Sequence, residues 1–391
     1  MNPAFPLGAS ISVAGLSADP YPLFRQLRAV EPVTWAPALG QWLVTSRDLA
    51  MEILRDPVRF RTDADRSPIR DTFGPQMLST EGEQQRRYKS ACAPPFNARA
   101  VQDQRSLVTA IVRARANDLR AEVSSELRRN YAAPIALETV ARVIGLSPEN
   151  DNLLREWYDT FADALANYAG TPETRVRAGA AVLAFRASIA PLLASPNADE
   201  RSLLAELARA YPRLLDDDEI GSNALIVLFG GIETTEAAIV NAVWAMLTHP
   251  ATQARARDND ADLARCLEES LRWEPAVQTC TRYAFGDCEI GGVRIPDGAL
   301  VQCMIGAMNR DPDHYANPDD YDPWRAETTP HTAFGFGRHF CLGAALARLE
   351  AMEALGQLLR GFPRLRLDLE RTDRPSGHEF RKPDRITTWL S

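Results

Sequence analysis

Apolar residues recur at helical spacing along most of the chain, with polar residues at the intervening positions. The longest such stretch runs from Asp217 to about Thr248, with acidic residues at its start and His249-Pro250 at its end. Shorter stretches with the same pattern cover residues 21–30, 81–92, 100–130, 134–144, 150–168, 172–193, 202–210, 260–273 and 342–360. The pattern predicts a mainly helical protein.

Alternation of apolar and polar residues marks a smaller β part. Residues 34–46 predict a hairpin, and residues 288–308 predict a small sheet that turns at Asp297-Gly298. Neither the helical spacing nor the strand-like alternation holds over residues 61–78. This indicates a long irregular loop, and such loops often carry function. A segment rich in proline and aspartate follows the sheet, and no repeat or Gly/Ser linker divides the chain.

The composition narrows the class of protein. The chain has 391 residues, of which 45% are hydrophobic and 25% are charged, and its formal net charge is −8. These values exclude collagen-like and disordered chains, and the acidic balance predicts no nucleic-acid partner. Lys89 and Lys382 are the only lysines, which we interpret as a genomic preference for arginine. No signal peptide or membrane span is recognisable, so a cytoplasmic protein without membrane attachment is expected.

The six cysteines, at positions 92, 266, 280, 288, 303 and 341, contain no CxxC pair. Their wide spacing disfavours a structural zinc site, and so few thiols in so long a chain disfavour a disulfide framework. The default interpretation of each is a small buried apolar side chain. The context of Cys341 departs from this default.

Cys341 stands in the segment FGFGRHFCLGAALARLE, just before the last predicted helix. Its three glycines permit tight turns and a close approach of the backbone to a flat ligand. A thiolate at a helix N-terminus is stabilised by the helix dipole and by backbone N–H groups. A helix-capping loop with a buried cysteine is one alternative. A catalytic nucleophile is another, although no Cys/His pairing pattern supports it.

Two adjacent glycines interrupt the long helix in the segment Gly230-Gly231-Ile232-Glu233-Thr234-Thr235. Each costs roughly 1 kcal/mol relative to alanine, so something must compensate. The missing side chains leave a groove where a ligand can approach the backbone. The acid and hydroxyl groups that follow predict a buried polar network with water or ligand. A helix kink with a capping threonine is the alternative.

The Cys341 segment resembles the haem-binding loop of the cytochrome P-450 family, FGxGxHxCxGxxLAR, at every specified position. The resemblance implies one large, mainly α domain over residues 1–391, with small β-sheets and a long central helix over the haem. It implies that Cys341 is the axial ligand of the haem iron and that His339 hydrogen-bonds a haem propionate. The other cofactor contacts that it implies in this loop are Phe334, Gly335 and Gly343.

Other segments match motifs of the same family. The glycine segment of the long helix resembles its [AG]GxET motif, which implies that Thr234 hydrogen-bonds the iron-bound peroxo group and that Glu233 relays protons toward it. Glu269 and Arg272 form an i,i+3 pair that matches the ExxR helix. Arg325 matches the arginine that completes this structural ion-pair network, which holds the thiolate loop.

Three further residues are implied to contact the haem. Arg282, in the segment QTCTRYAF, matches an arginine that meets a propionate. Gln85 and Lys89 occupy positions where many members carry histidine and arginine, so the sequence departs from the common pattern there. The glutamine amide still donates a hydrogen bond, and the lysine keeps the charge without the bidentate geometry.

The implied function is that of a haem-thiolate monooxygenase that contains haem b, activates dioxygen and hydroxylates or dealkylates a small organic substrate. Its electrons, ultimately from NAD(P)H, are expected from a separate ferredoxin- or flavodoxin-type donor with its reductase. Arg86, Arg87 and Arg338 are candidates for the docking face, with solvated surface arginines as the alternative reading. A monomer is expected.

Two other functional classes remain as alternatives. The same fold serves peroxygenases and enzymes of oxidative coupling or desaturation, but retention of Glu233 and Thr234 favours dioxygen activation. A haem-based gas sensor generally needs an output domain, and none is recognised. The substrate pocket is expected to involve residues 61–78, 157–185, 277–279 and Phe380, with Arg66 and Arg70 as candidates for attracting a carboxylate.

Overall fold

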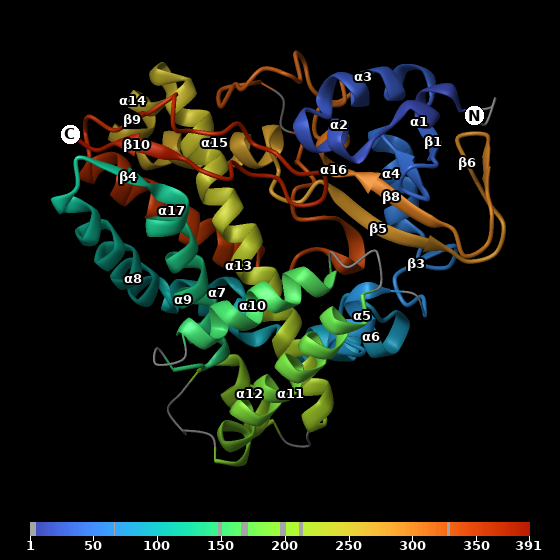
Figure 1. Cartoon of the computed structure of the whole chain (residues 1–391), viewed down its shortest axis with the longest axis horizontal. Coiled ribbons are helices and arrows are strands. Elements are labelled where there is room, and N and C mark those ends of the chain that lie inside the picture. Colours follow the sequence, from blue (N-terminus) through green and yellow to red (C-terminus); the bar gives the residue numbers. More distant parts are fainter. Residues whose placement is uncertain are drawn as a thin grey trace.

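The computed structural model describes residues 5–65, 67–147, 151–165, 171–195, 201–210, 214–326 and 329–391. Figure 1 shows that helices make up most of the molecule and that the strands gather at its periphery. The α-helices are α1 (Pro6–Ser10), α2 (Val13–Ala18), α3 (Tyr21–Val30), α4 (Arg47–Arg55), α5 (Pro68–Phe73), α6 (Gly82–Cys92), α7 (Ala98–Asp103), α8 (Arg105–Asp118), α9 (Ala133–Ile144), α10 (Asp151–Leu165), α11 (Pro172–Ala194), α12 (Leu203–Arg209), α13 (Asp217–Thr248), α14 (Pro250–Asp258), α15 (Asp260–Trp273), α16 (Ile305–Met308) and α17 (Ala344–Gly361). The mainly α fold class predicted from the sequence is confirmed.

The strands form three small sheets. A five-stranded sheet has the order β1-β2-β8-β5-β3, in which only the β2–β8 pair is parallel. A three-stranded sheet has the order β4-β10-β9, and β6 pairs with β7. The strands are β1 (Val33–Ala36), β2 (Gln41–Val44), β3 (Phe60–Arg61), β4 (Ser124–Glu126), β5 (Thr279–Ala284), β6 (Cys288–Ile290), β7 (Val293–Ile295), β8 (Leu300–Met304), β9 (Arg366–Leu367) and β10 (Thr387–Trp389).

Helix α13 runs through the middle of the molecule (Figure 1). It begins with a capping box, because the Asp216 carboxylate accepts a hydrogen bond from the N–H of Glu219 and the Glu219 side chain accepts one from the N–H of Asp216. Its first half packs in one hydrophobic core and its second half in another. The glycine segment lies where the two cores meet, so side-chain packing around the central helix is interrupted at that point.

Two predictions of local structure are wrong. Residues 61–78 are not wholly irregular, because Ser67 caps the short helix α5, Pro68 starts it and Gly74 (φ +81°) ends it. Residues 100–130 are not one helix. The chain leaves the helical path after Asp118 and forms β4, because its pairing partner β10 lies more than 250 residues later and leaves no local signal.

The β-turn prediction needs a smaller correction. The tight hairpin turn lies between β6 and β7, at Gly291 (φ +56°) and Gly292 (φ +77°). Gly298 (φ +70°) redirects the chain from β7 to β8, which then pairs with β5 and β2 rather than with β7.

Two helices, α11 and α13, are long and apolar enough to span a membrane by length and composition alone. The apolar window of α13 is mostly buried among other helices, as expected for the core helix of a globular protein, whereas that of α11 is mostly exposed.

Candidate active site

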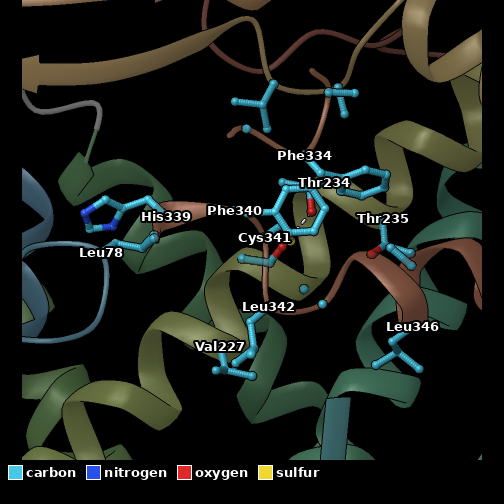
Figure 2. Close-up of a pocket in the computed structure, with 18 of the residues that line it drawn as sticks. Leu78, Val227, Thr234, Thr235, Phe334, His339, Phe340, Cys341, Leu342 and Leu346 are labelled. Atoms are coloured by element: carbon cyan, nitrogen blue, oxygen red, sulfur yellow. Dashed lines mark hydrogen bonds between the residues drawn. The ribbon is translucent and has the colours of Figure 1, made fainter. Parts of the chain in front are cut away.

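A cavity of about 300 Å³ separates the middle of α13 from the loop that carries Cys341. Figure 2 shows Cys341, Phe334 and Thr234 converging on this space. Most of the surface that surrounds it is apolar. Its walls include Met77, Leu78, Ile226, Val227, Gly230, Thr234, Val277, Thr279, Cys280, Phe334, Gly335, His339, Cys341, Gly343, Leu346 and Glu350.

The Cys341 loop is a compact chain of turns that requires its glycines. Gly335 (φ +72°) and Gly337 (φ +73°) adopt backbone conformations that side-chain-bearing residues rarely take. The N–H of Cys341 donates to the carbonyl of Phe334 at 2.9 Å, which closes the loop just ahead of α17. The turn therefore fixes Cys341 at the helix N-terminus that the sequence indicates.

The Cys341 side chain is exposed only in the sense that it opens into the cavity. Burial raises the pKa of its thiol above the ordinary value, while the Gly343 N–H and the charges of Lys89 and Arg348 oppose that rise. The pKa stays raised, so burial favours the neutral thiol, and a metal cation bound to the sulfur would favour the thiolate instead.

His339 offers a donor or acceptor that the described residues leave unused. Its Nε2 atom lies 3.0 Å from Glu81, whereas its buried Nδ1 atom has no hydrogen-bond partner in the described part of the chain. Burial lowers the pKa of His339, against the effect of Glu81. The ring lines the cavity and fits a ligand that carries an acidic oxygen.

Two glycines leave room on opposite walls of the cavity. A Cβ atom at Gly230 on α13, or at Gly343 on the Cys341 loop, would meet no atom within 4 Å. The cavity is thus an apolar slot between two stretches of bare backbone. It has a thiol on one wall and an unpartnered imidazole nitrogen at the side, and this is the donor set that haem requires. The residues present therefore fit the cofactor that the sequence motif implies.

Gln85 and Lys89, both on α6, hold the Cys341 loop from outside. The Gln85 amide donates to the carbonyl of Arg338 at 3.1 Å. Lys89 Nζ donates to the carbonyls of Arg338 and Phe340, both at 2.7 Å. Both side chains also border the cavity, so they stand close to the predicted cofactor while their polar ends bind the loop backbone.

Arg282 lies on β5 and is buried, but it is not among the residues that line the cavity. Its guanidinium donates to the carbonyl of Thr281 at 2.7 Å. Its charge also contributes to lowering the pKa of His339, after the larger effect of burial, so the two side chains are within electrostatic reach.

Thr234 and Glu233 occupy different sides of α13. The Thr234 hydroxyl donates to the Gly230 carbonyl at 2.6 Å and faces the cavity. The Glu233 carboxylate accepts hydrogen bonds from the Tyr158 hydroxyl and from Lys382, whose Nζ atom lies 2.6 Å away. It borders a second, polar cleft instead. The structure thus does not bring the two side chains together.

Glu269, Arg272 and Arg325 form one buried cluster. Arg272 pairs with Glu269 in a bidentate manner at 2.7 and 2.8 Å, and Arg325 reaches the same carboxylate at 3.1 Å. Arg272 also donates to the carbonyls of three residues of the segment between β8 and the Cys341 loop: Asn309, Pro318 and Asp320. The cluster ties α15 to that segment and lies apart from the cavity.

Comparison with known proteins places this geometry in a family. A family model described as Cytochrome P450 matches residues 193–381. The biotin biosynthesis cytochrome P450 of Bacillus subtilis (strain 168) is 30% identical over 94% of this chain and 96% of its own length. The chain belongs to the cytochrome P450 family. It is therefore a haem-dependent monooxygenase of the oxidoreductase class that uses dioxygen.

Two further relatives of this cytochrome P450 agree with that assignment. The 6-deoxyerythronolide B hydroxylase of Saccharopolyspora erythraea is 29% identical over 91% of each chain. Among solved structures, P450BioI in complex with hexadec-9Z-enoic acid ligated acyl carrier protein has a TM-score of 0.87 and 27% identity, and the match covers 95% of this chain and 98% of that one.

The sequence interpretation missed four side chains at the site of this cytochrome P450. Glu81 binds His339, and Glu268 binds both Arg348 and His331. Glu350 borders the cavity fully buried, and burial raises its pKa well above the ordinary value. Lys382 binds Glu233. Only Lys382 carried a signal, because it is one of just two lysines in the chain.

The segments expected to line the substrate pocket contribute unequally. Met77, Leu78, Val277 and Thr279 border the cavity. Four other rings from the expected segments pack on one another and on Phe229 of α13 and do not border the cavity: Phe73, Tyr158, Phe161 and Phe380. Arg70 donates to the Ser79 carbonyl and does not border the cavity, and Arg66 lies outside the described residues.

Proposed function

We propose that this chain is a single haem domain, residues 1–391, that hydroxylates or dealkylates a small apolar organic compound with dioxygen. The observation that carries the proposal is the Cys341 thiol, which opens into an apolar cavity across from Thr234. The hydroxylases among the relatives support the reaction type. A monomer in the cytoplasm, without membrane attachment or nucleic-acid partner, is part of the same proposal.

The haem contacts are assigned to residues that line the cavity and to Arg282, which is buried on β5 within electrostatic reach of His339. Cys341 ligates the iron, and a thiolate-ligated haem iron activates dioxygen and favours cleavage of its O–O bond. His339 and Arg282 bind the propionates, and Phe334, Gly335 and Gly343 pack on the ring. Gln85 and Lys89 hold the Cys341 loop in place through its carbonyls. Glu269, Arg272 and Arg325 keep the segment before that loop in place.

The proposed roles on α13 concern protons. The Thr234 hydroxyl, which now donates to the Gly230 carbonyl, would turn toward the cavity and donate a hydrogen bond to a ligand held there. Glu233 relays protons from the far side of the helix. Burial alone would raise the pKa of the Glu233 carboxyl, but Lys382, Tyr158 and Arg128 outweigh burial and hold it below its ordinary value.

Electrons are proposed to come from NAD(P)H through a separate ferredoxin- or flavodoxin-type protein and its reductase. Of the candidate docking residues, Arg86 pairs with Glu83 on its own helix with both side chains exposed. Arg87 binds Glu219, and Arg338 lies 3.5 Å from Glu81. Arg86 and Arg338 therefore remain the more available charges for an acidic partner.

The deciding experiment is the carbon-monoxide difference spectrum of the reduced protein. The thiolate-type, red-shifted Soret band is expected in the wild type and should be lost in Cys341→Ser. Cys280→Ser is the matched control, because Cys280 also borders the cavity and should leave the band in place. A wild-type spectrum without that band would overturn the proposal.

Substrate classes are then separated by titration of the spin state. Apolar alcohols, macrolactones and free fatty acids test the apolar cavity directly. Acyl chains on an acyl carrier protein belong in the panel because the structural neighbour P450BioI has such a protein as its partner. Turnover with hydrogen peroxide alone, equal to that with the electron donor, would favour a peroxygenase instead.

A further inference from the structure

Two of the six cysteines stand opposite each other on neighbouring strands of the five-stranded sheet. Cys280 of β5 and Cys303 of β8 are Cα partners in the antiparallel β5–β8 ladder, and both are free thiols. Both pack in the same hydrophobic cluster between the sheet and α4. Cys288, which also lies on a strand, has Ile295 as its partner instead. Cys280 and Cys303 therefore form a pair of thiols that the sheet itself aligns.

The position of the pair in the ladder brings the two sulfurs within bonding reach. Two residues along, the Ile305 N–H donates to the Gln278 carbonyl at 2.7 Å, and hydrogen-bonded pairs recur at every second residue of an antiparallel ladder. Cys280 and Cys303 are thus a hydrogen-bonded pair, with Cα atoms about 5.5 Å apart. Disulfides join Cα atoms that are roughly 4.4–6.8 Å apart. Because directly opposed side chains share a face of the sheet, rotation of the side chains is enough to join the sulfurs.

The two thiols differ in their access to small molecules. Cys280 is half-buried and borders the cavity that Cys341 also borders. Cys303 is fully buried, and its thiol donates to the Ala50 carbonyl at 3.8 Å. Burial raises the pKa of both thiols, and the Cys280 thiol raises that of Cys303 further, so the two sulfurs are within electrostatic reach of each other. A small oxidant in the cavity meets Cys280 first.

Cys280 also lies beside the Cys341 loop. A Cβ atom at Gly335 would lie 3.7 Å from the Cys280 sulfur, so the thiol is next to the backbone of that loop. Phe336 of the same loop packs against the cluster that contains both cysteines. If the Cys280 sulfur turns toward Cys303, the loop loses a packing contact on the side of the sheet.

We propose that Cys280 and Cys303 form a reversible disulfide when hydrogen peroxide accumulates in the cavity, and that this bond draws the Cys280 sulfur away from the Cys341 loop. Peroxide oxidises the Cys280 thiol to a sulfenic acid and releases one water. The Cys303 sulfur then attacks the Cys280 sulfur, and the hydroxyl group leaves with the Cys303 proton as a second water. Two thiols and one peroxide thus give one disulfide and two waters.

The oxidant is the peroxide that a dioxygen-using haem enzyme releases when electrons arrive and no product forms. A disulfide that responds to an oxidant, rather than a permanent one, is the kind expected in a reducing compartment. This inference goes beyond the proposed function, because it adds no step to the oxidation of a substrate. It assigns a modification site to the sheet beside the cavity.

The test maps thiols in haem-loaded protein that is first reduced, then treated with hydrogen peroxide, blocked with N-ethylmaleimide and digested with trypsin. Cleavage after arginine places Cys280, Cys288 and Cys303 in three separate peptides, residues 273–282, 283–294 and 295–310. Mass spectrometry should find the first and third peptides joined, and dithiothreitol should separate them. Cys288 should carry N-ethylmaleimide. Oxidation of Cys280 to a sulfinic acid without the joined peptides, or equal joining to the Cys288 peptide, would overturn the proposal.

Single variants test the order of the two reactions. In Cys303→Ala, which keeps an apolar side chain in the buried position, Cys280 should proceed to a sulfinic acid because no second thiol intercepts it. In Cys280→Ser, Cys303 should stay reduced. Cys288→Ser is the matched control and should form the disulfide as the wild type does. Oxidation of Cys303 in Cys280→Ser at the wild-type rate would overturn the proposal. The wild-type peptide map decides the matter even where a variant does not fold.

The effect on the Cys341 loop is measured by the transfer of haem to apomyoglobin. The oxidised wild type should lose haem several-fold faster than the reduced protein, and dithiothreitol should restore the slower rate. Cys280→Ser, treated with the same peroxide, should show no change that dithiothreitol reverses, which separates the disulfide from damage to the haem. Equal rates for the oxidised and reduced wild type would overturn the proposed link to the loop. The peptide map requires no turnover, so its result does not depend on the proposed hydroxylation.

Discussion

Gly231 of α13 faces Val140 of α9 so closely that a Cβ atom on the glycine would lie 2.5 Å from Cγ2 of the valine. No relaxed structure holds two non-bonded carbon atoms at that distance. At the adjacent Gly230, in contrast, a Cβ would meet nothing within 4 Å. The two glycines therefore have separate purposes. One lets α9 approach the central helix, and the other leaves the cavity wall bare, although the sequence pattern suggests a single groove.

Alanine substitutions at these two positions should have different effects. Gly231→Ala overpacks the α9–α13 contact at a typical cost of about 1–3 kcal/mol, offset by about 1 kcal/mol of helix propensity. Its melting temperature should fall by roughly 1–2 °C. Gly230→Ala gains the propensity without the clash, so it should melt no lower than the wild type and instead weaken azole binding. Circular dichroism melts and azole titrations check both, and equal melting temperatures would contradict the assignment.

The sequence predicts those parts of the site that short-range patterns encode. The central helix is marked by its apolar period and by the acidic residues at its start, and the Cys341 loop is marked by glycines that need positive φ. The hairpin at residues 34–46 likewise follows from local alternation and is observed as β1 and β2. In each case the residues that fix the geometry lie within a few positions of one another.

Contacts between distant segments had no such signal. Glu81 is 258 residues from the His339 ring that it binds, and β4 pairs with a strand near the C-terminus. The direction of Glu233 depends on Lys382 and Tyr158, which only the folded chain brings to α13. The scarcity of lysine was interpreted as genomic bias, yet Lys89 borders the cavity and Lys382 binds Glu233. The lysine count alone suggested no function for these two residues, because their function depends on where each lies in the folded chain.

Thr234→Ala should separate cofactor binding from productive turnover. The variant loses the hydroxyl that faces the cavity but no other cavity contact, so haem content and the carbon-monoxide spectrum should remain normal. Turnover should divert toward free hydrogen peroxide, with product per NAD(P)H falling several-fold. Thr248→Ala is the control, since Thr248 makes the same type of bond to a carbonyl four residues earlier in α13, away from the cavity. Unchanged coupling of electrons to product in Thr234→Ala would refute the role.

The lowered pKa of Glu268 predicts that the protein loses stability as the pH falls. Burial alone would raise its pKa, but Arg348 and His331 outweigh burial and bring it to about 2, from an ordinary value of 4.5. A depressed pKa means that the ionised form stabilises the fold above pH 4.5, and that this contribution is lost as the pH falls toward 2. Since the side chain is 44% exposed, screening limits the contribution to about 1 kcal/mol.

The measurement compares Glu268→Gln with the wild type by thermal unfolding at pH 7, 4 and 3. The variant should melt lower at pH 7, and the difference should narrow at pH 4 and narrow further at pH 3. Glu83→Gln removes an ion pair in which both side chains are mostly exposed, so it should show no such trend. A difference that stays constant with pH would mean that the Glu268 charge is not the stabilising element.

Arg86 and Arg87 are neighbours on α6, and removing the charge of one should have a different effect from removing the charge of the other. Arg87 binds Glu219 at 2.9 Å and the Leu214 carbonyl at 2.8 Å, so it ties α6 to the start of α13. Arg87→Gln should lower the melting temperature and keep the salt dependence of reduction. Arg86→Gln should melt normally but slow reduction by an acidic ferredoxin several-fold at low salt, because Arg86 is exposed and its pair with the exposed Glu83 is easily exchanged for the partner. Stopped-flow reduction from about 0.02 to 0.5 M NaCl measures this. The opposite pattern would place the docking face elsewhere.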